Sequence, residues 1–198
     1  EPSSVAYNCV FERAGGFRPG ATVVIYGMGP IGLTAAAECK AAGAAKVIAF
    51  ELSAPRREVS AKMGADYVYD PTAVDPVQVV MDLTHGRGAE LQVDAAGAPD
   101  VIIPVMERCV AINGKIAQVG RAATRVPMYL ETLQVRRGQV YGSQGHSGHG
   151  IFPSVISMMA AGLIDTRPMI TARYSLDQVV DAIAQSTKRT DAKIMVKI

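Results

Sequence analysis

Residues 23–51 read VVIYGMGPIGLTAAAECKAAGAAKVIAFE, and this stretch decides the fold. Two apolar runs, Thr22 to Tyr26 and Lys46 to Phe50, enclose a glycine-rich turn and an alanine-rich segment. Short, continuously apolar runs are typical of strands that are buried on both faces of a parallel sheet. Pro30 suits the start of a helix, where its missing N–H does no harm, and Gly43 suits the end. The stretch therefore predicts a strand, a tight turn, a helix and a second strand.

The turn has the pattern G-x-G-x-x-G, and each glycine has a physical role. The first allows a tight turn, the second lets the backbone approach a pyrophosphate, and the third lets helix and strand pack closely. The phosphates would lie at the helix N-terminus, where unpaired N–H groups and the helix dipole favour an anion. A glycine turn kept for packing alone would have the same pattern. The residues predicted to contact the cofactor here are Gly27, Met28, Gly29, Pro30, Ile31 and Gly32.

One carboxylate follows the second apolar run. Glu51 lies roughly 20 residues past the last glycine of the turn, the place of the acid that binds the adenosine ribose hydroxyls. Hydrogen bonds to a carboxylate contribute about 1.5–3 kcal/mol, and the same charge repels a 2′-phosphate. We therefore expect NAD rather than NADP. Arg56 and Arg57 complicate this choice, because an arginine near the ribose can accept the extra phosphate, although Arg56 could equally lie flat on the adenine.

Strand-like and helix-like segments continue to alternate along the chain. Six short apolar strands with helices between most of them predict the α/β class, with a doubly wound six-stranded parallel sheet of the Rossmann type. The closing segment KIMVKI is apolar at alternate positions but has no obvious place in that sheet. The other predicted strands are residues 66–69, 91–94, 115–119 and 139–142, and the other predicted helices are residues 54–63, 76–86, 101–111, 152–161 and 175–187.

Composition and charge exclude several classes of function. The 198 residues, 49% of them apolar, suit one sizeable domain or one and a half. A net charge of +2 from scattered basic residues indicates neither a nucleic-acid nor a membrane partner. The three separated cysteines form no C-x-x-C pair, which favours a reducing compartment, and we expect a cytoplasmic protein. The sequence shows no leader and no apolar run of about 18 residues, so we expect no signal peptide and no membrane span.

Several segments resemble the cofactor half of the medium-chain, zinc-dependent alcohol and polyol dehydrogenases. They are GMGPIG, ELSAPRR, KMGADYV, VDAAGAP and AKIMVKI, in that order and spacing. The opening EPSSV is similar to the segment with which sorbitol dehydrogenases enter this domain, and the loop GSQGHSGHG is similar to that of bacterial scyllo-inosose dehydrogenases. In the family, the N-terminal half is a GroES-like catalytic domain that carries the zinc. The resemblance implies that this domain is missing here, that residues 1–17 lead in from it, that residues 18–165 bind the dinucleotide, and that residues 166–198 return to it.

The resemblance also assigns individual roles. Ile31 would contact the cofactor at the turn, and Arg56 the adenine. The acidic residue that opens this segment in sorbitol dehydrogenases can approach or ligate the zinc, and it matches Glu1, for which a frayed terminal residue is the alternative. The loop at residues 144–149 would lie over the nicotinamide, or would be a glycine-rich connection at a subunit interface. The residues implied on the nicotinamide side are Ala96, Val119, Gly120 and Gln144.

Other chemically capable residues have plainer interpretations. His146-x-x-His149 could present two nitrogens to a metal, but glycines flank both and no third ligand is near in sequence. His85 reads as a solvated residue at a helix end. Asp94 could reach the cofactor, or could bond neighbouring backbone at the end of a buried strand. The sequence predicts no catalytic residue within this chain.

The predicted function is the NAD-binding part of a zinc-dependent oxidoreductase, inactive as this fragment alone. It would transfer hydride between NAD and a secondary alcohol of an inositol- or sugar-like polyol, with zinc in the full-length enzyme. The alternatives are a zinc-free quinone or enoyl reductase of the same superfamily and a non-catalytic NAD-sensing module. Family members associate through the sixth strand, so residues 139–142 are predicted to pair with a second copy in a homodimer or homotetramer.

Overall fold

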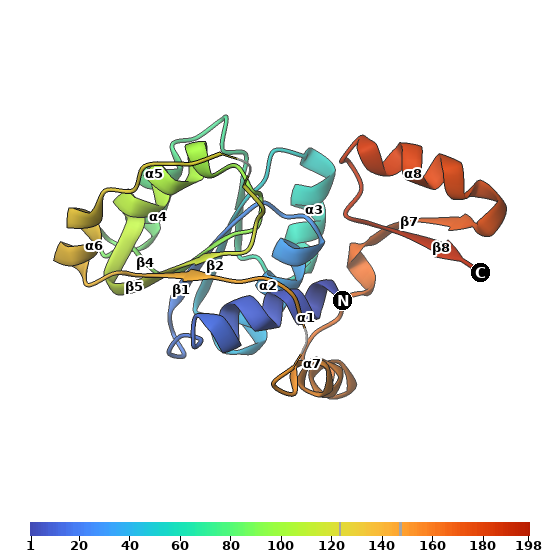
Figure 1. Cartoon of the computed structure of the whole chain (residues 1–198), viewed down its shortest axis with the longest axis horizontal. Coiled ribbons are helices and arrows are strands. Elements are labelled where there is room, and N and C mark those ends of the chain that lie inside the picture. Colours follow the sequence, from blue (N-terminus) through green and yellow to red (C-terminus); the bar gives the residue numbers. More distant parts are fainter. Residues whose placement is uncertain (123, 147) are drawn as a thin grey trace.

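A computed structural model describes residues 1–122, 124–146 and 148–198 (Figure 1). Its main sheet has six parallel strands in the order β3-β2-β1-β4-β5-β6. This confirms the predicted doubly wound Rossmann sheet. The strands are β1 (Thr22–Tyr26), β2 (Lys46–Phe50), β3 (Tyr67–Tyr69), β4 (Ala89–Asp94), β5 (Val110–Gln118) and β6 (Gln139–Gly142).

Helices cover both faces of the sheet. One buried cluster joins the sheet to α1, α2, α3 and α7, and a second joins it to α4 and α5, with α6 packed against its margin (Figure 1). These helices are α1 (Pro2–Tyr7), α2 (Pro30–Ala41), α3 (Ala54–Lys62), α4 (Pro76–Leu83), α5 (Pro99–Cys109), α6 (Leu130–Arg136) and α7 (Ile151–Ala160).

The strand residues alternate between the two buried clusters. In β1, Val23 and Ile25 belong to the cluster under α2, whereas Val24 and Tyr26 belong to the cluster under α4 and α5. Every residue of β1 is buried. This explains why the strand reads as a continuous apolar run rather than as an alternating one.

The helices α2, α3 and α4 begin at the predicted residues, whereas α5 begins two residues earlier, at Pro99. Proline occupies the first turn of α2, α3, α4 and α5. The Asp75 side chain caps α4 by accepting a hydrogen bond from the Val77 N–H at 2.9 Å. Ser53 is the N-cap residue of α3, but its hydroxyl makes no capping bond there. Prolines and cap residues therefore fix where the crossover helices begin.

Three segments differ from the sequence prediction. Residues 130–136 were not predicted to be helical, but they form α6. Residues 1–17 were given no predicted secondary structure, but they contain α1, which continues into a π-helix, η1 (Asn8–Arg13). Cys9 and Val10 of that π-helix belong to the buried cluster under α2. The strand predicted at residues 115–119 begins earlier, because β5 starts at Val110, and its register with β4 shifts around Asn113 and Gly114. Asn113 takes a positive φ of 58° there, as a turn residue would.

The closing strand has a partner that the sequence did not indicate. β8 (Lys193–Lys197) pairs in parallel with β7 (Ile170–Ser175), and α8 (Val179–Thr187) connects them. Two single-turn 3₁₀ helices, η2 (Arg167–Met169) and η3 (Leu176–Gln178), flank β7, and the predicted capping box of Ser175 and Gln178 is present. This unit lies beyond α3, at the right of Figure 1. A single strand pair is marginally stable alone, so α8 packing on it is needed.

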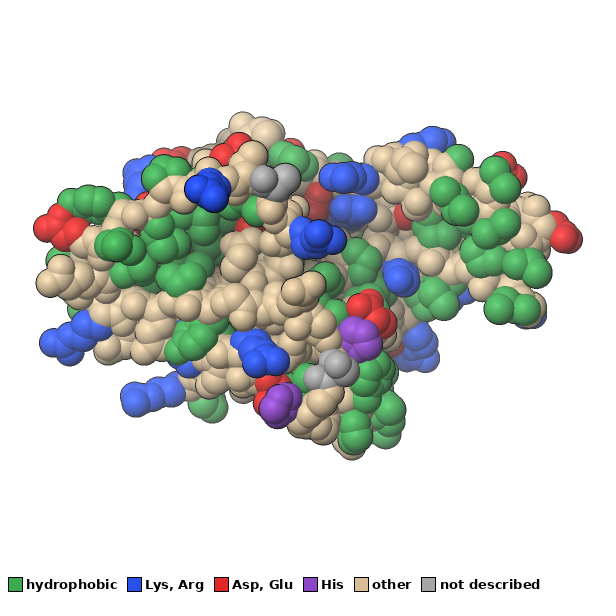
Figure 2. All heavy atoms as spheres, in the orientation of Figure 1, with side chains coloured by type: hydrophobic (Ala, Val, Ile, Leu, Met, Phe, Trp, Pro, Cys, Tyr) green, Lys and Arg blue, Asp and Glu red, His purple; other side chains and the backbone are tan. Residues whose placement is uncertain are grey.

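Apolar side chains gather on the surface of this unit (Figure 2). The exposed large apolar residues of the unit are Leu176, Val180, Ile183, Met195 and Ile198.

None of the helices formed by residues 1–122, 124–146 and 148–198 combines the length and apolar character needed to span a membrane.

Candidate functional site

The carboxyl ends of the strands lie in register along one edge of the sheet. Tyr26 pairs with Phe50 on one side and with Asp94 on the other, and the register continues from Asp94 to Gln118. The strand order reverses at β1, which has β2 on one side and β4 on the other. Open α/β sheets bind ligands outside the carboxyl ends of their strands at such a switch point. The segments that follow β1, β2, β4 and β5 therefore form the candidate site.

The glycine turn occupies this switch point and is tightly packed at two of its glycines. Gly27 has a φ of 87°, and a Cβ there would lie 2.7 Å from the Ala96 Cβ. A Cβ on Gly32 would lie 1.9 Å from the Gly27 carbonyl oxygen. Gly29 differs, because a Cβ there would meet no atom within 4 Å beyond its chain neighbours. The turn is thus closed on its protein side and open at Gly29.

The amino end of α2 begins at the open glycine. Gly29 is the N-cap residue, and its carbonyl accepts the first intrahelical bond, from the Leu33 N–H at 2.9 Å. The N–H groups of Ile31 and Gly32 precede that bond, so the helix offers them no partner. Unpaired N–H groups and the positive end of the helix dipole favour an anion. The open space at Gly29 and these two donors fit the pyrophosphate of a dinucleotide.

Glu51 is bonded to the glycine turn. Its Oε2 accepts a hydrogen bond from the Met28 N–H at 2.6 Å, and its Oε1 accepts one from the Ser53 N–H at 2.8 Å. The residue is only 8% exposed. The carboxylate thus joins the turn after β1 to the turn after β2, and its remaining lone pairs are available to hydroxyl donors. The structure thus brings together the glycine turn and Glu51, which the sequence predicted to act together in binding the cofactor.

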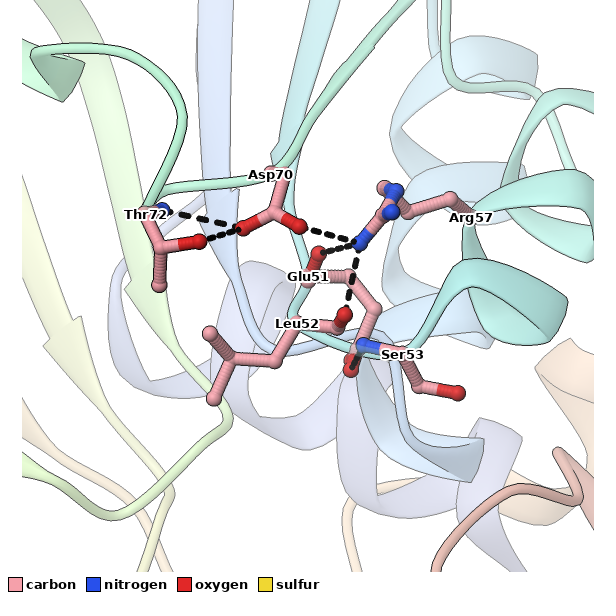
Figure 3. Close-up of polar contacts among 6 residues, drawn as sticks. All are labelled: Glu51, Leu52, Ser53, Arg57, Asp70 and Thr72. Atoms are coloured by element: carbon pink, nitrogen blue, oxygen red, sulfur yellow. Dashed lines mark hydrogen bonds and ion pairs between the residues drawn. The ribbon is translucent and has the colours of Figure 1, made fainter.

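Arg57 holds the turn that carries Glu51 (Figure 3). Its Nη1 donates to the Glu51 carbonyl at 2.9 Å and to the Leu52 carbonyl at 2.6 Å, and lies 3.0 Å from the Asp70 Oδ2. The other oxygen of Asp70 accepts bonds from the Thr72 hydroxyl at 2.7 Å and the Thr72 N–H at 2.9 Å. These bonds from Thr72, and then the Arg57 charge, lower the pKa of Asp70. Asp70 and Thr72 were not among the predicted site residues.

Arg56, the arginine predicted at the adenine, is bonded elsewhere. Its Nε donates to the Asp191 carbonyl at 2.9 Å, just before β8. The guanidinium therefore links the start of α3 to the C-terminal segment. Its predicted contact with the adenine stays a prediction.

The predicted nicotinamide-side residues meet around Asp94, at the end of β4. The Asp94 carbonyl accepts bonds from the N–H groups of Val119 at 3.1 Å and Gly120 at 2.8 Å. Its Oδ1 accepts from the Ala96 N–H at 2.9 Å, and its Oδ2 from the Gln118 Nε2 at 2.7 Å. The predicted bonding of Asp94 to neighbouring backbone is confirmed. These bonds fix the loops after β4 and β5 against one another.

The loop that carries Gln144 is held by the N-terminal helices. Asn8, 2% exposed, donates from Nδ2 to the Gln144 carbonyl at 3.3 Å and to the Gly145 carbonyl at 2.9 Å. The π-helix that supplies Asn8 is a rare element that is often found at functional sites. Ser147 of the predicted loop lies outside the described residues.

Comparison with known proteins agrees with this geometry. Residues 30–161 match the family model described as zinc-binding dehydrogenase. The chain belongs to this family. It is 47% identical to the scyllo-inosose 3-dehydrogenase of Thermotoga maritima and 31% identical to the sorbitol dehydrogenase of Bacillus subtilis. These matches cover 100% and 99% of this chain but 50% and 55% of the relatives, so the chain spans about half the length of the curated relatives it matches.

A solved structure matches the whole chain. It is described as an alcohol dehydrogenase of Thermotoga maritima, has 46% sequence identity and superposes with a TM-score of 0.95. The match covers 100% of this chain and 51% of the solved one. The resemblance to zinc-type polyol dehydrogenases that the sequence suggested is therefore confirmed at the level of family and fold.

The family is named after zinc, but the described residues offer that metal no site. Among residues 1–122, 124–146 and 148–198, no three His, Cys, Asp or Glu side chains lie close enough to hold a metal. The three cysteines are buried, and burial raises the pKa of Cys9 and Cys109 to about 12 and that of Cys39 well above its ordinary value. A cysteine binds zinc as its thiolate, so these buried thiols are unsuited to the role. The assignment of Glu1 to zinc stays a prediction.

Two hollows lie away from the candidate site. One is enclosed by α4, α5 and α6, and the other lies at the amino ends of β1, β4, β5 and β6. The candidate site is instead an open edge, recognised by its hydrogen-bonding groups.

Replacing Asn8 with alanine is expected to loosen the loop of Gln144. The variant loses two hydrogen bonds from a buried amide, which costs about 1–3 kcal/mol because the two carbonyls are left without that donor. Hydrogen exchange measured by mass spectrometry should show faster exchange of the peptides that cover residues 143–146. Gln134→Ala, which truncates an exposed amide on α6, is the control and should exchange as the unmodified chain does. Unchanged exchange in Asn8→Ala would show that the loop is held by other contacts.

Proposed function

We propose that this chain is the NAD-binding part of a zinc-dependent dehydrogenase that acts on a secondary alcohol of a cyclic or sugar-like polyol. One observation carries the cofactor assignment. The Glu51 carboxylate is bonded to the Met28 N–H of an open glycine turn at the switch point of the sheet. A ribose acid joined to a pyrophosphate turn is the arrangement that a dinucleotide requires.

Each part of the site has a separate task in this proposal. The N–H groups at the start of α2 bind the pyrophosphate, and Glu51 accepts hydrogen bonds from the adenosine ribose. The loops fixed by Asp94 support the nicotinamide, and the loop at Gln144 borders the substrate. When bound, NAD accepts or donates a hydride at its nicotinamide ring. The negative charge of Glu51 disfavours a 2′-phosphate, which supports NAD over NADP.

The relatives support a polyol substrate. Scyllo-inosose and sorbitol, which name the two dehydrogenases cited above, are both polyhydroxylated molecules. The higher identity is to the scyllo-inosose enzyme, 47% against 31%. We therefore favour a cyclic polyol or its ketone.

The zinc of the family would be held mainly by parts of the enzyme other than this chain, whose predicted contribution is Glu1. The relatives are about twice as long, and the apolar surface of β8 and α8 is suited to packing against a further domain. Strand β6 lies at the outer edge of the sheet, where pairing with a second copy would extend it. The proposed dimer or tetramer would form through this strand.

Titration calorimetry on this chain tests the cofactor assignment. The unmodified chain is expected to bind NAD and to bind NADP more weakly. Glu51→Gln should weaken NAD binding roughly 10- to 100-fold, because bonds to a charged acceptor contribute about 1.5–3 kcal/mol. Glu58→Gln, on the exposed face of α3, is the matched control and should bind like the unmodified chain. Absence of binding to either dinucleotide, or full affinity in Glu51→Gln, would contradict the proposal.

A further inference from the structure

The two arginines that open α3 are used differently, and the difference bears on cofactor choice. Arg56 is turned to the Asp191 carbonyl. Arg57 instead bonds the backbone carbonyl of Glu51, the same residue whose carboxylate is proposed to bind the ribose. A guanidinium so close to the ribose is the group that would recognise a 2′-phosphate, because its planar fork matches phosphate oxygens.

Asp70 engages this guanidinium from the end of the neighbouring strand (Figure 3). Its Oδ2 lies 3.0 Å from the Arg57 Nη1, and both side chains are about one-quarter exposed. Thr72 bonds the other oxygen of Asp70 through both its hydroxyl and its N–H, which fixes the carboxylate in place. The bonds from Thr72 lower the pKa of Asp70 further below its ordinary range, so the carboxylate is charged at neutral pH.

The charges of Glu51, Asp70 and Arg57 determine the electrostatic field at the proposed ribose site. Glu51 and Asp70 each contribute −1 and Arg57 contributes +1, so the group carries a net charge of −1. Without Asp70 the group would be neutral, and Arg57 would keep only the two carbonyl bonds that hold it to the turn. The Arg57 charge would then no longer be offset by Asp70 and could attract an anion to the guanidinium fork.

We propose that Asp70 is a selectivity residue for the cofactor: by pairing with Arg57 it neutralises the cation nearest the ribose and so disfavours a 2′-phosphate. This inference rests on the proposed binding of a nicotinamide dinucleotide at Glu51. It goes further, because it assigns the discrimination between NAD and NADP to two features. One is the ion pair between Asp70, which follows β3, and Arg57 of α3, and the other is Glu51, the acid after β2. Asp70 acts through Arg57 and is therefore a positioning residue.

A double-mutant cycle on this chain tests the inference, with the ratio of NAD to NADP affinity as the readout. Asp70→Asn keeps the shape and removes the charge, so the ratio should move toward NADP by roughly tenfold, the scale expected for removing one nearby like charge at modest ionic strength. Arg57→Met should move the ratio the other way. In the double variant the gain of Asp70→Asn should shrink, because the part of the gain that requires the freed arginine is lost.

The remaining outcomes separate this inference from the proposed function. Asp165→Asn breaks an exposed aspartate–arginine pair on another part of the surface and should leave the ratio unchanged. An Asp70→Asn variant that binds both dinucleotides equally less well would reveal a purely structural role and overturn the inference. An unchanged ratio would overturn it too.

Thr72→Val, which frees Asp70 without altering any charge, replaces Asp70→Asn if that variant does not fold and should shift the ratio in the same direction. If the unmodified chain binds neither dinucleotide, the proposed function fails first.

Discussion

Gly32→Ala is expected to destabilise the fold strongly, whereas Gly29→Ala is expected to leave it intact and weaken cofactor binding strongly. A Cβ on residue 32 would lie 1.9 Å from the Gly27 carbonyl oxygen, so the turn or the helix must move. The clashing atom belongs to the backbone, so no change of side-chain rotamer can relieve the clash. We expect a loss of about 3 kcal/mol or more in the free energy of unfolding, at the upper end for overpacking. For a chain of this size the melting temperature should fall by roughly 10 °C.

Gly29→Ala provides the contrast, because it changes the same turn without a clash. Residue 29 has a φ of −71°, which alanine adopts freely, and its Cβ would enter open space. Melting should therefore be unchanged or slightly raised, since alanine restricts the unfolded chain more than glycine does. The new methyl would occupy the space proposed for the pyrophosphate.

Calorimetry with NAD on both glycine variants supplies the measurement. Affinity in Gly29→Ala should fall on the order of 100-fold, equivalent to about 2.8 kcal/mol. If Gly29→Ala melts like the unmodified chain and also binds NAD as tightly, no pyrophosphate approaches the backbone there. If Gly32→Ala has the melting temperature of the unmodified chain, the close packing of the turn against α2 does not contribute to stability, which would contradict the prediction.

The sequence predicted the sheet because local pattern and fold agree there. The strand Thr22–Tyr26 and the helix that begins at Pro30 are marked by features within a few residues, namely a continuous apolar run, a proline and glycines. The pairing of Glu51 with the turn was also predictable, because the spacing of the motif reflects one strand–helix–strand unit.

The contacts that complete the site could not be predicted in the same way. Asn8 bonds residues 136 and 137 positions away, and no local pattern marks such a partner. Arg57 and Asp70 are brought together by the parallel pairing of β2 with β3, so their contact follows only once the strand order is known. The helix α6 was missed because it has no buried residue, and hence no apolar stripe for a periodicity argument to find.

Glu38 is an acidic residue in an apolar setting. It lies in the segment AAAECKAA and is fully buried in α2. In the described part of the chain neither of its carboxyl oxygens has a hydrogen-bond partner. Burial raises the pKa of Glu38 from 4.5 to about 9. The folded protein therefore keeps this side chain neutral at physiological pH.

A raised acid pKa has a defined consequence for stability. Below pH 4.5 both folded and unfolded chains hold the proton, so Glu38 imposes no ionisation cost. Between about pH 4.5 and pH 9 the unfolded chain releases that proton and the folded chain retains it. The free energy of unfolding should therefore fall as pH rises, by about 1.4 kcal/mol per unit, and level off near pH 9. At pH 7.5 the accumulated loss is of the order of 4 kcal/mol.

Urea denaturation between pH 5 and pH 9 should show this slope in the unmodified chain and lose it in Glu38→Gln, where residue 38 cannot ionise. Glu38→Leu should also lose the slope and, by removing unpaired buried oxygens, be more stable than the unmodified chain by about 2–4 kcal/mol at pH 7.5. The control is Glu58→Leu, an equivalent change on the exposed face of α3, which should keep the slope. If Glu38→Gln follows the unmodified chain at every pH, the Glu38 carboxylate is solvated or paired in the folded protein, contrary to its burial without a hydrogen-bond partner in the structure.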